Sequence, residues 1–395
     1  MRTIGQRSIR TAAGAIFSGC LLALTVVTPS QAQTAADEFV SERTFFRTTI
    51  DGKSVRLEGF VLKRADLTGR LPIALITHGK SANLADMLAL RASDYTPYAR
   101  DLARRGYLSV VVIRRGFGQS DGPMPVNMTC ESKSFNDLFT ADADDLQGAL
   151  ELASRRPDAD PERAIAIGVS AGGAAVMALA ARNPKNLRGV INVSGGLQTP
   201  SCPKDEALVS AFKDYGSTGR VPSIWIYAKN DSLFNPSLVE RMQSAYLDGG
   251  GDVKLVMYDK FGKDGHEIFG DPNGRLRWLM EMDGFLRFHD LPATRRDQIA
   301  ELLKLTKLEP RHAAFIDQYL AAPTSKVMVQ TPDGNDYMTQ YGASSLELAR
   351  GALLKTCQER HKSAQPCKVV MENDTWVGPT VPERVAAGPA DRAVQ

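Results

Sequence analysis

The sequence has few of the residues that hold metals or build redox centres. Its 395 residues include five cysteines and five histidines, and no C-x-x-C or H-E-x-x-H spacing groups them into a metal site. The glycines at 249–251 are not followed by the Lys-Ser/Thr pair of a phosphate-binding loop. We therefore predict a protein with no metal and no cofactor.

The sequence also lacks a strong charge of either sign. The formal net charge is +3 at pH 7, and the first 32 residues contain Arg2, Arg7 and Arg10 but no acidic residue. Without that segment the chain is close to neutral, so its charge argues against nucleic acid as a partner. The share of hydrophobic residues, 43%, is typical of a packed globular protein.

The long apolar run lies at the N-terminus, across residues 12–27. The arginines precede it and Ser30-Gln31-Ala32 follows it, which is the order of a secretory signal peptide cleaved after Ala32. The run is short for a membrane span, so we predict no stable membrane insertion. The expected location is the periplasm or the exterior, and a membrane anchor or a lipid on Cys20 are the alternatives.

Removal of residues 1–32 leaves an even number of cysteines: Cys130, Cys202, Cys357 and Cys367. Exported proteins form disulfides, and four cysteines allow three pairings. We predict a Cys130–Cys202 bridge between two loops and a local Cys357–Cys367 bridge. Four free thiols are the alternative if the chain stays in the cytoplasm.

Short β-rich runs alternate with helical stretches over most of the chain. This alternation predicts an α/β fold in which helices cover both faces of a mostly parallel sheet. The expected strands are 44–50, 55–63, 73–77, 108–113, 164–169, 189–193, 223–227 and 253–258, with an Asp51-Gly52 turn between the first two. The expected helices are 95–105, 137–155, 172–182, 236–246 and 275–288.

The pattern changes after Leu291. Two amphipathic helices are expected at 295–305 and 309–320, and a third at 345–360 that begins at a Ser345 cap. Short strands are expected at 326–330 and 368–371. These elements predict a small C-terminal α+β module, followed by a disordered tail at 381–395.

The most informative motif is Gly168-Val169-Ser170-Ala171-Gly172, which lies between an expected strand and an Ala-rich helix. A G-x-S-x-G motif in that context presents a nucleophilic serine on a strained turn. The backbone N–H of Ala171, at the helix start, then points at a developing oxyanion. We expect the N–H of Lys80, after the strand that ends in His78-Gly79, to be the second donor, with the His78 side chain in a structural role.

A serine needs a base, and the base needs a carboxylate. His266 lies in the Gly-rich loop after the last expected strand, at the sheet edge where open α/β folds bind ligands. Asp231 follows the strand at 223–227 and is the expected acid, with Asp259 and Asp264 as rivals. Two arginines of the loop at this edge, Arg114 and Arg115, are candidates for contact with an anionic substrate.

The chain resembles the α/β-hydrolase superfamily and, more narrowly, exported dienelactone-hydrolase-like proteins. The resemblance lies in the serine motif, the strand end at His78-Gly79, the loop that contains His266, and residues 114–122 and 224–231. The resemblance covers about residues 44 to 290, and it implies an α/β-hydrolase fold with a Ser170, Asp231, His266 triad. Dienelactone hydrolases themselves are cytosolic and have a cysteine nucleophile, so Ser170 argues against lactone opening. We predict domains at 1–32 (signal peptide), 37–290 (catalytic α/β-hydrolase domain) and 291–380 (C-terminal module with the local disulfide).

The predicted function is hydrolysis of a carboxylic ester, from a small molecule or a polymer, through an acyl-enzyme on Ser170. A serine peptidase of the prolyl-oligopeptidase type is the first alternative, because the same fold and triad serve it. A non-catalytic envelope protein on a hydrolase scaffold is the second. The C-terminal module resembles a small module of other exported bacterial proteins, and it is the candidate for contact with the cell envelope.

Overall fold

The computed structural model describes residues 39–50, 52–81, 83–123, 135–198, 203–293, 296–322 and 325–379. The predicted signal peptide, Asp51, Cys130, Cys202 and the tail lie outside the described residues. Within them, no helix is long and apolar enough to cross a membrane. Two sheets organise the described residues: an eight-stranded sheet in the order β1-β2-β4-β3-β5-β6-β7-β8 and a four-stranded sheet in the order β10-β9-β11-β12.

The large sheet is mostly parallel. Its first strand pairs antiparallel with β2, which pairs antiparallel with β4, and all later pairs are parallel. Its strands are β1 (Phe39–Ile50), β2 (Lys53–Arg64), β3 (Leu71–Thr77), β4 (Leu108–Val112), β5 (Ala159–Val169), β6 (Leu187–Val193), β7 (Ser223–Ala228) and β8 (Val253–Tyr258). The predicted fold class, a mostly parallel α/β-hydrolase sheet plus a small C-terminal α+β module, is confirmed. The predicted domain boundaries stay predictions.

The edge hairpin follows from a two-residue turn. Ile50 pairs with Lys53, and Gly52, the residue before Lys53, adopts φ 73°. Two-residue hairpin turns require this left-handed backbone, which glycine adopts without steric cost. Gly52 therefore favours the register in which Ile50 pairs with Lys53.

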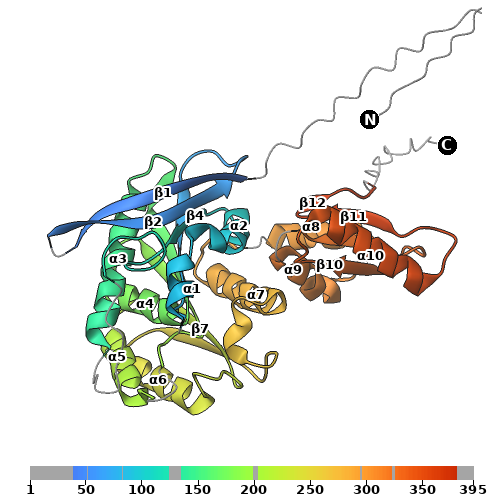
Figure 1. Cartoon of the computed structure of the whole chain (residues 1–395). Coiled ribbons are helices and arrows are strands. Elements are labelled where there is room, and N and C mark those ends of the chain that lie inside the picture. Colours follow the sequence, from blue (N-terminus) through green and yellow to red (C-terminus); the bar gives the residue numbers. More distant parts are fainter. Residues whose placement is uncertain are drawn as a thin grey trace, which may run out of the picture. The chain divides into compact units, whose positions relative to one another are not determined.

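Helices cover both faces of the large sheet, as Figure 1 shows. One face packs against α3 (Asn136–Ser154), α4 (Ala171–Ala180), α5 (Asp205–Thr218) and α6 (Pro236–Asp248), and the other against α1 (Leu84–Ala89), α2 (Thr96–Arg104) and α7 (Pro272–Phe288). Successive residues of β3 alternate between the two cores: Ile73 and Leu75 face one, Ala74 and Ile76 the other. Burial on both faces explains why this strand is apolar throughout.

The parallel strands bring their following loops to one edge of the sheet. Gly168 of β5 pairs with Thr77 of β3, and Ala228 of β7 pairs with Tyr258 of β8. The chain segments that follow β3, β5, β7 and β8 therefore leave the sheet at its carboxyl edge. That edge is where open α/β sheets place their ligand sites.

Sequence reasoning missed two α-helices and two strands, and it began several strands too late. It did not predict α1, α5, β10 (Tyr337–Gln340) or β12 (Thr375–Trp376), and β1 and β5 begin at Phe39 and Ala159 rather than at 44 and 164. The buried residues of α5 are Leu208, Ala211, Phe212, Tyr215 and Gly216. Their i, i+3, i+4, i+7, i+8 spacing is that of an amphipathic helix, so the sequence did contain a periodic signal for α5.

The C-terminal module has its own core around the small antiparallel sheet. Its strands are β9 (Val327–Gln330), β10, β11 (Lys368–Glu372) and β12, and its helices are α8 (Arg296–Thr306), α9 (Ala313–Ala321) and α10 (Leu346–His361). Met328 packs with residues of α8 and α9, whereas Val327 and Val329 pack with α10. The predicted Ser345 cap is confirmed, because its side chain accepts a hydrogen bond from the N–H of Leu348.

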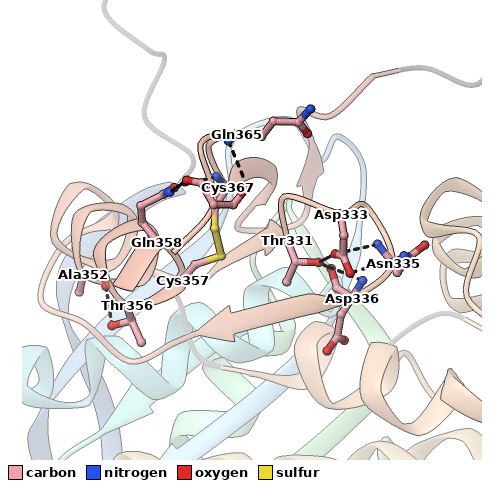
Figure 2. The surroundings of a disulfide bond; sticks show 11 residues. Thr331, Asp333, Asn335, Asp336, Ala352, Thr356, Cys357, Gln358, Gln365 and Cys367 are labelled. Carbon is pink, nitrogen blue, oxygen red and sulfur yellow. Dashed lines mark hydrogen bonds between the residues drawn. A yellow bond between two sulfur atoms is a disulfide. The ribbon is translucent and has the colours of Figure 1, made fainter. Parts of the chain in front are cut away.

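A disulfide joins Cys357 of α10 to Cys367, one residue before β11, as the sequence predicts. Figure 2 shows the bridge beside Gln358, whose side-chain oxygen accepts a hydrogen bond from the N–H of Cys367 at 3.3 Å. The amide nitrogen of Gln358 donates to the carbonyl oxygen of Ser363 at 2.6 Å. The short loop between helix and strand is thus tied by one covalent bond and two hydrogen bonds.

Candidate active site

Ser170 occupies a strained turn between β5 and α4. Its backbone has φ 54° and ψ −124°, a conformation that non-glycine residues rarely adopt. The N–H of Ser170 donates to the carbonyl oxygen of Val193, and its own carbonyl oxygen accepts from the N–H of Gly173. These bonds hold the strained residue in place at the carboxyl edge of the sheet.

The two glycines of the motif are required by close approaches of the backbone. A Cβ on Gly168 would overlap the carbonyl oxygen of Gly172, and one on Gly172 would overlap the carbonyl oxygen of His78. Any side chain at either position would therefore push α4 away from β5 or β3. The spacing G-x-S-x-G follows from this packing of helix against strand ends.

His266 lies between Ser170 and a carboxylate. Its Nε2 is 3.2 Å from the Ser170 hydroxyl, and its Nδ1 is 3.2 and 3.1 Å from the two carboxylate oxygens of Asp231. The Asp231 side chain is fully buried and also accepts hydrogen bonds from the N–H groups of Leu233 and Phe234. The arrangement is that of a nucleophile, a base and an orienting acid.

The rival acids have other partners. Asp264 accepts hydrogen bonds from the hydroxyl of Ser232 at 2.6 Å and from the backbone N–H of His266 at 2.9 Å. It therefore caps the short 3-10 helix η2 (Gly265–Ile268) that carries His266. Asp259 pairs with Lys229 on the surface. Of the three carboxylates, Asp231 is the one that meets the imidazole ring.

The surroundings of His266 change its acidity in opposing ways. Burial lowers the pKa of the imidazole, but the hydrogen bond and charge of Asp231, with smaller contributions from Asp264 and Glu267, outweigh burial and raise it above the ordinary 6.5. A base must be neutral to accept a proton. The group therefore loses its basic form as the pH falls through this raised pKa.

We expect activity to rise with pH along a single protonation whose midpoint lies above 6.5. The rate of ester hydrolysis, followed by acid release at constant ionic strength over about pH 5 to 9, measures this midpoint in kcat/KM. A flat profile would contradict the assignment of His266 as the base, and a midpoint below 6.5 would show that burial outweighs Asp231 in setting its pKa.

Two chain segments adjoin the nucleophile, and they carry the predicted oxyanion donors. Ala171 is the first residue of α4, and the first N–H groups of a helix have no acceptor within it. Gly79 passes directly against the nucleophile, since a Cβ on it would be 3.3 Å from Cβ of Ser170. The predicted donors of Ala171 and Lys80 therefore lie on adjoining segments.

Arg114 and Arg115 have carboxylate partners on α3. Arg114 is almost fully buried and pairs with Asp142 at 3.0 Å, and Arg115 pairs with Asp145 at 2.9 Å. Neither arginine is among the residues that line the cavity beside His266. Both arginines therefore pack against α3, and neither contributes to the wall of that cavity.

A cavity of about 430 Å³ adjoins His266. One part of its wall is apolar and aromatic, with Tyr95, Tyr98, Phe117 and Phe269, of which Tyr98 and Phe269 stack at 4.4 Å. Charged side chains also line it: Lys80, Asp86, Asp94 and Glu267. A larger cavity, of about 670 Å³, has Arg105 and Leu291 in its wall. Its wall contains none of Ser170, Asp231 and His266.

Sequence reasoning missed the cavity's aromatic residues and the partners of the arginines. Tyr95 belongs to the 3-10 helix η1 (Ala92–Tyr95) and Phe269 follows η2, so only the fold brings them together. Asp142 and Asp145 are three positions apart on α3, a spacing that places them on one helix face. That spacing indicated an acidic face on the helix, but it did not indicate that the face pairs with Arg114 and Arg115.

The chain is similar to known hydrolases over part of its length. Residues 88–215 match the profile of the serine aminopeptidase S33 family. A protein of Nocardia uniformis subsp. tsuyamanensis named as an esterase, NocK, is 29% identical over 162 residues. That match covers 41% of this chain and 40% of the relative's length.

Similar solved structures include a protein of Klebsiella pneumoniae subsp. pneumoniae described as a dienelactone hydrolase. It is 18% identical with a TM-score of 0.47, and the match covers 64% of this chain and 98% of that one. An acylaminoacyl peptidase of Pyrococcus horikoshii has 18% identity and a TM-score of 0.47, and covers 66% of this chain and 43% of its own. The sheet order and the serine turn between β5 and α4 are those of the α/β-hydrolase fold.

Proposed function

We propose that the protein is an exported serine hydrolase that cleaves carboxylic esters through an acyl-enzyme. The observation that carries the proposal is the continuous chain of contacts from the Ser170 hydroxyl through His266 to buried Asp231. A serine hydroxyl is a weak nucleophile unless a positioned base removes its proton. This chain of contacts supplies the base, its tautomer and its orientation.

In the first half-reaction, Oγ of Ser170 attacks the ester carbonyl while its proton passes to Nε2 of His266. Asp231 keeps the other ring proton on Nδ1 and stabilises the imidazolium that forms. The carbonyl oxygen gains the negative charge, which the N–H groups of Ala171 and Lys80 stabilise. Collapse of the intermediate breaks the bond to the alcohol, which leaves with the proton from His266.

In the second half-reaction, water takes the place of the alcohol. His266 accepts a proton from the water as its oxygen attacks the acyl carbon, and a second tetrahedral intermediate forms at the same donors. Its collapse releases the carboxylic acid and returns the proton to Ser170. The cavity beside His266, with Tyr98 and Phe269 in its wall, is the proposed binding site for the substrate.

A peptidase is the second candidate, because the matching family profile is that of a serine aminopeptidase. The two activities share the chemistry of Ser170 and differ in the leaving group. An amide carbonyl is more strongly stabilised by resonance than an ester carbonyl, so a site that does not position a peptide hydrolyses esters far faster than amides. Relative turnover of the two substrate types therefore separates the candidates.

We expect p-nitrophenyl esters of short acyl chains to be turned over, and peptide p-nitroanilides to be hydrolysed at least about a hundredfold more slowly, a difference of about 2.7 kcal/mol in activation free energy. Labelling by a fluorophosphonate probe is measured on the same preparation, because only an activated serine reacts. Faster turnover of the anilides would favour the peptidase. An unlabelled protein would favour the non-catalytic alternative.

Export and attachment complete the proposal. The arginines, the apolar run and Ser30-Gln31-Ala32 support cleavage after Ala32 and a periplasmic or secreted protein. The disulfide between Cys357 and Cys367 is consistent with an oxidising compartment. We assign contact with the cell envelope to the C-terminal module. The N-terminal sequence of the protein recovered from its native compartment tests the cleavage.

A further inference from the structure

The side chain of His78 makes two hydrogen bonds that determine its protonation. Its Nε2 accepts from the backbone N–H of Arg114 at 3.0 Å, so the ring proton lies on Nδ1. That nitrogen is 2.7 Å from the carbonyl oxygen of Gly79, to which it donates. Burial lowers the pKa of His78 well below its ordinary value, which keeps the ring neutral and this pattern of donor and acceptor intact.

The direction of the Gly79 carbonyl determines the direction of the next N–H. In a trans peptide the C=O and the N–H point to opposite sides of the chain. Because the Gly79 carbonyl is bonded to His78, the N–H of Lys80 points away from the His78 ring. Gly79 itself adjoins Ser170, so the orientation of this one peptide decides whether a donor is available to the oxyanion.

Arg114 contacts the same segment with its side chain. One guanidinium nitrogen, Nη1, donates to the carbonyl oxygen of His78 at 2.6 Å and to the hydroxyl of Thr77 at 2.8 Å. Nε donates to Asp142 on α3 at 3.0 Å. The side chains of Arg114 and Asp142 are 1% and 3% exposed, so water does not compete for these bonds.

We propose that Arg114, oriented by Asp142, is a positioning residue that fixes the Gly79–Lys80 peptide through His78 and so presents the Lys80 N–H to the oxyanion. The inference rests on the proposed function, because an oxyanion forms only if Ser170 attacks a carbonyl. Arg114 holds the strand end by three bonds: its backbone N–H meets the His78 ring, and its guanidinium meets the backbone of His78 and the side chain of Thr77.

The neighbouring arginine provides a matched control. Arg115 is next in sequence, is largely buried, and pairs with Asp145 on the same helix. Its guanidinium also donates to the carbonyl oxygen of Ala141 and lies 3.9 Å from Asp144, both on α3. Arg115 therefore resembles Arg114 in residue type, partner type and supporting helix, but its guanidinium meets α3 rather than the strand end beside the nucleophile.

The test compares Arg114→Lys with Arg115→Lys in the full chain. A lysine keeps the charge opposite the aspartate but loses the planar fork that bonds several acceptors at once. We expect Arg114→Lys to lower kcat about 10- to 100-fold with little change in KM, approaching the loss of one oxyanion donor. Affinity for a boronic acid, which forms a tetrahedral anion on the serine, should fall by the same factor. Arg115→Lys should change each quantity by less than about threefold.

A second variant shows whether the effect passes through His78. His78→Phe keeps an aromatic ring against Phe117, which lies 4.6 Å away, but removes both hydrogen-bonding nitrogens. We expect it to lower kcat by a factor similar to that of Arg114→Lys, and the double variant to be little worse than either single one. Thermal melting of each variant separates a misplaced peptide from a loss of fold, and His78→Phe carries the test if Arg114→Lys does not fold.

The outcomes separate this inference from the proposed function. If the wild-type protein is not labelled by a fluorophosphonate, the proposed function fails and this inference fails with it. If the wild type is labelled but Arg114→Lys and Arg115→Lys lose equal activity, only the positioning role is wrong. Additive losses in the double variant, or unchanged boronic acid affinity, would also overturn it.

Discussion

Ser170→Ala is expected to lower ester hydrolysis by at least about 10³-fold while leaving the fold intact. The hydroxyl 3.2 Å from Nε2 of His266 is the atom that would bond to the substrate, and a methyl group cannot replace it. The change removes one oxygen from a side chain of a residue with 9% exposure, so the free energy of unfolding should change by about 1 kcal/mol or less.

Turnover of a p-nitrophenyl ester, circular dichroism and fluorophosphonate labelling together measure this effect. His266→Ala should cost a similar factor, because the members of a triad act as a unit. Ser217→Ala serves as a control for the loss of a hydroxyl: this surface residue of α5 donates to the carbonyl oxygen of Asp214, outside the set of contacts that joins Ser170 to Asp231. Wild-type turnover in either Ser170→Ala or His266→Ala would refute the assignment.

Asp231→Asn is expected to lower kcat by about 10³- to 10⁴-fold. The carboxylate accepts the Nδ1 proton of His266 at 3.1 Å. An amide nitrogen at that position would instead donate to Nδ1 and leave the ring proton on Nε2, where it blocks proton transfer from Ser170. The defect should therefore appear in kcat and in the rate of fluorophosphonate labelling more than in KM.

Asp264→Asn is the matched control, since it makes the same change from carboxylate to amide at the cap of η2, the short helix that carries His266. Its carboxylate bonds to Ser232 and to the backbone N–H of His266, not to the ring. An amide retains one acceptor oxygen for these bonds, so we expect a loss of less than about tenfold. If Asp264→Asn were the crippling change and Asp231→Asn the mild one, the acid would have to be reassigned.

In the α/β part, sequence predicted strands and helices correctly where the residues of the element itself carry the signal. The apolar run of β3 and the Ala-rich run of α4 are buried throughout, so their composition alone marks them. The α5 helix was missed although its buried residues recur at helical spacing, a periodic signal that the sequence contains. The predicted Cys130–Cys202 bridge stays a prediction, since both residues lie outside the described part of the chain.

The sequence by itself determined the features that depend on a few neighbouring residues. The serine turn is one, because Gly168 and Gly172 are needed for backbone contacts within the motif itself and with the adjacent strand end. The Cys357–Cys367 bridge is another, since a separation of 10 residues lets a short loop close on itself.

Tertiary structure decided which side chains meet across the sheet. Asp231 and His266 are 35 residues apart in the chain, and a second aspartate, Asp264, lies nearer to His266 in sequence, so spacing alone left the acid open. Arg114 suggested a substrate contact because it lies in a loop at the site edge, yet its guanidinium is buried against Asp142. Such partners are chosen by the packing of α3 against the strand ends, where a buried charge must find an opposite charge and hydrogen bonds.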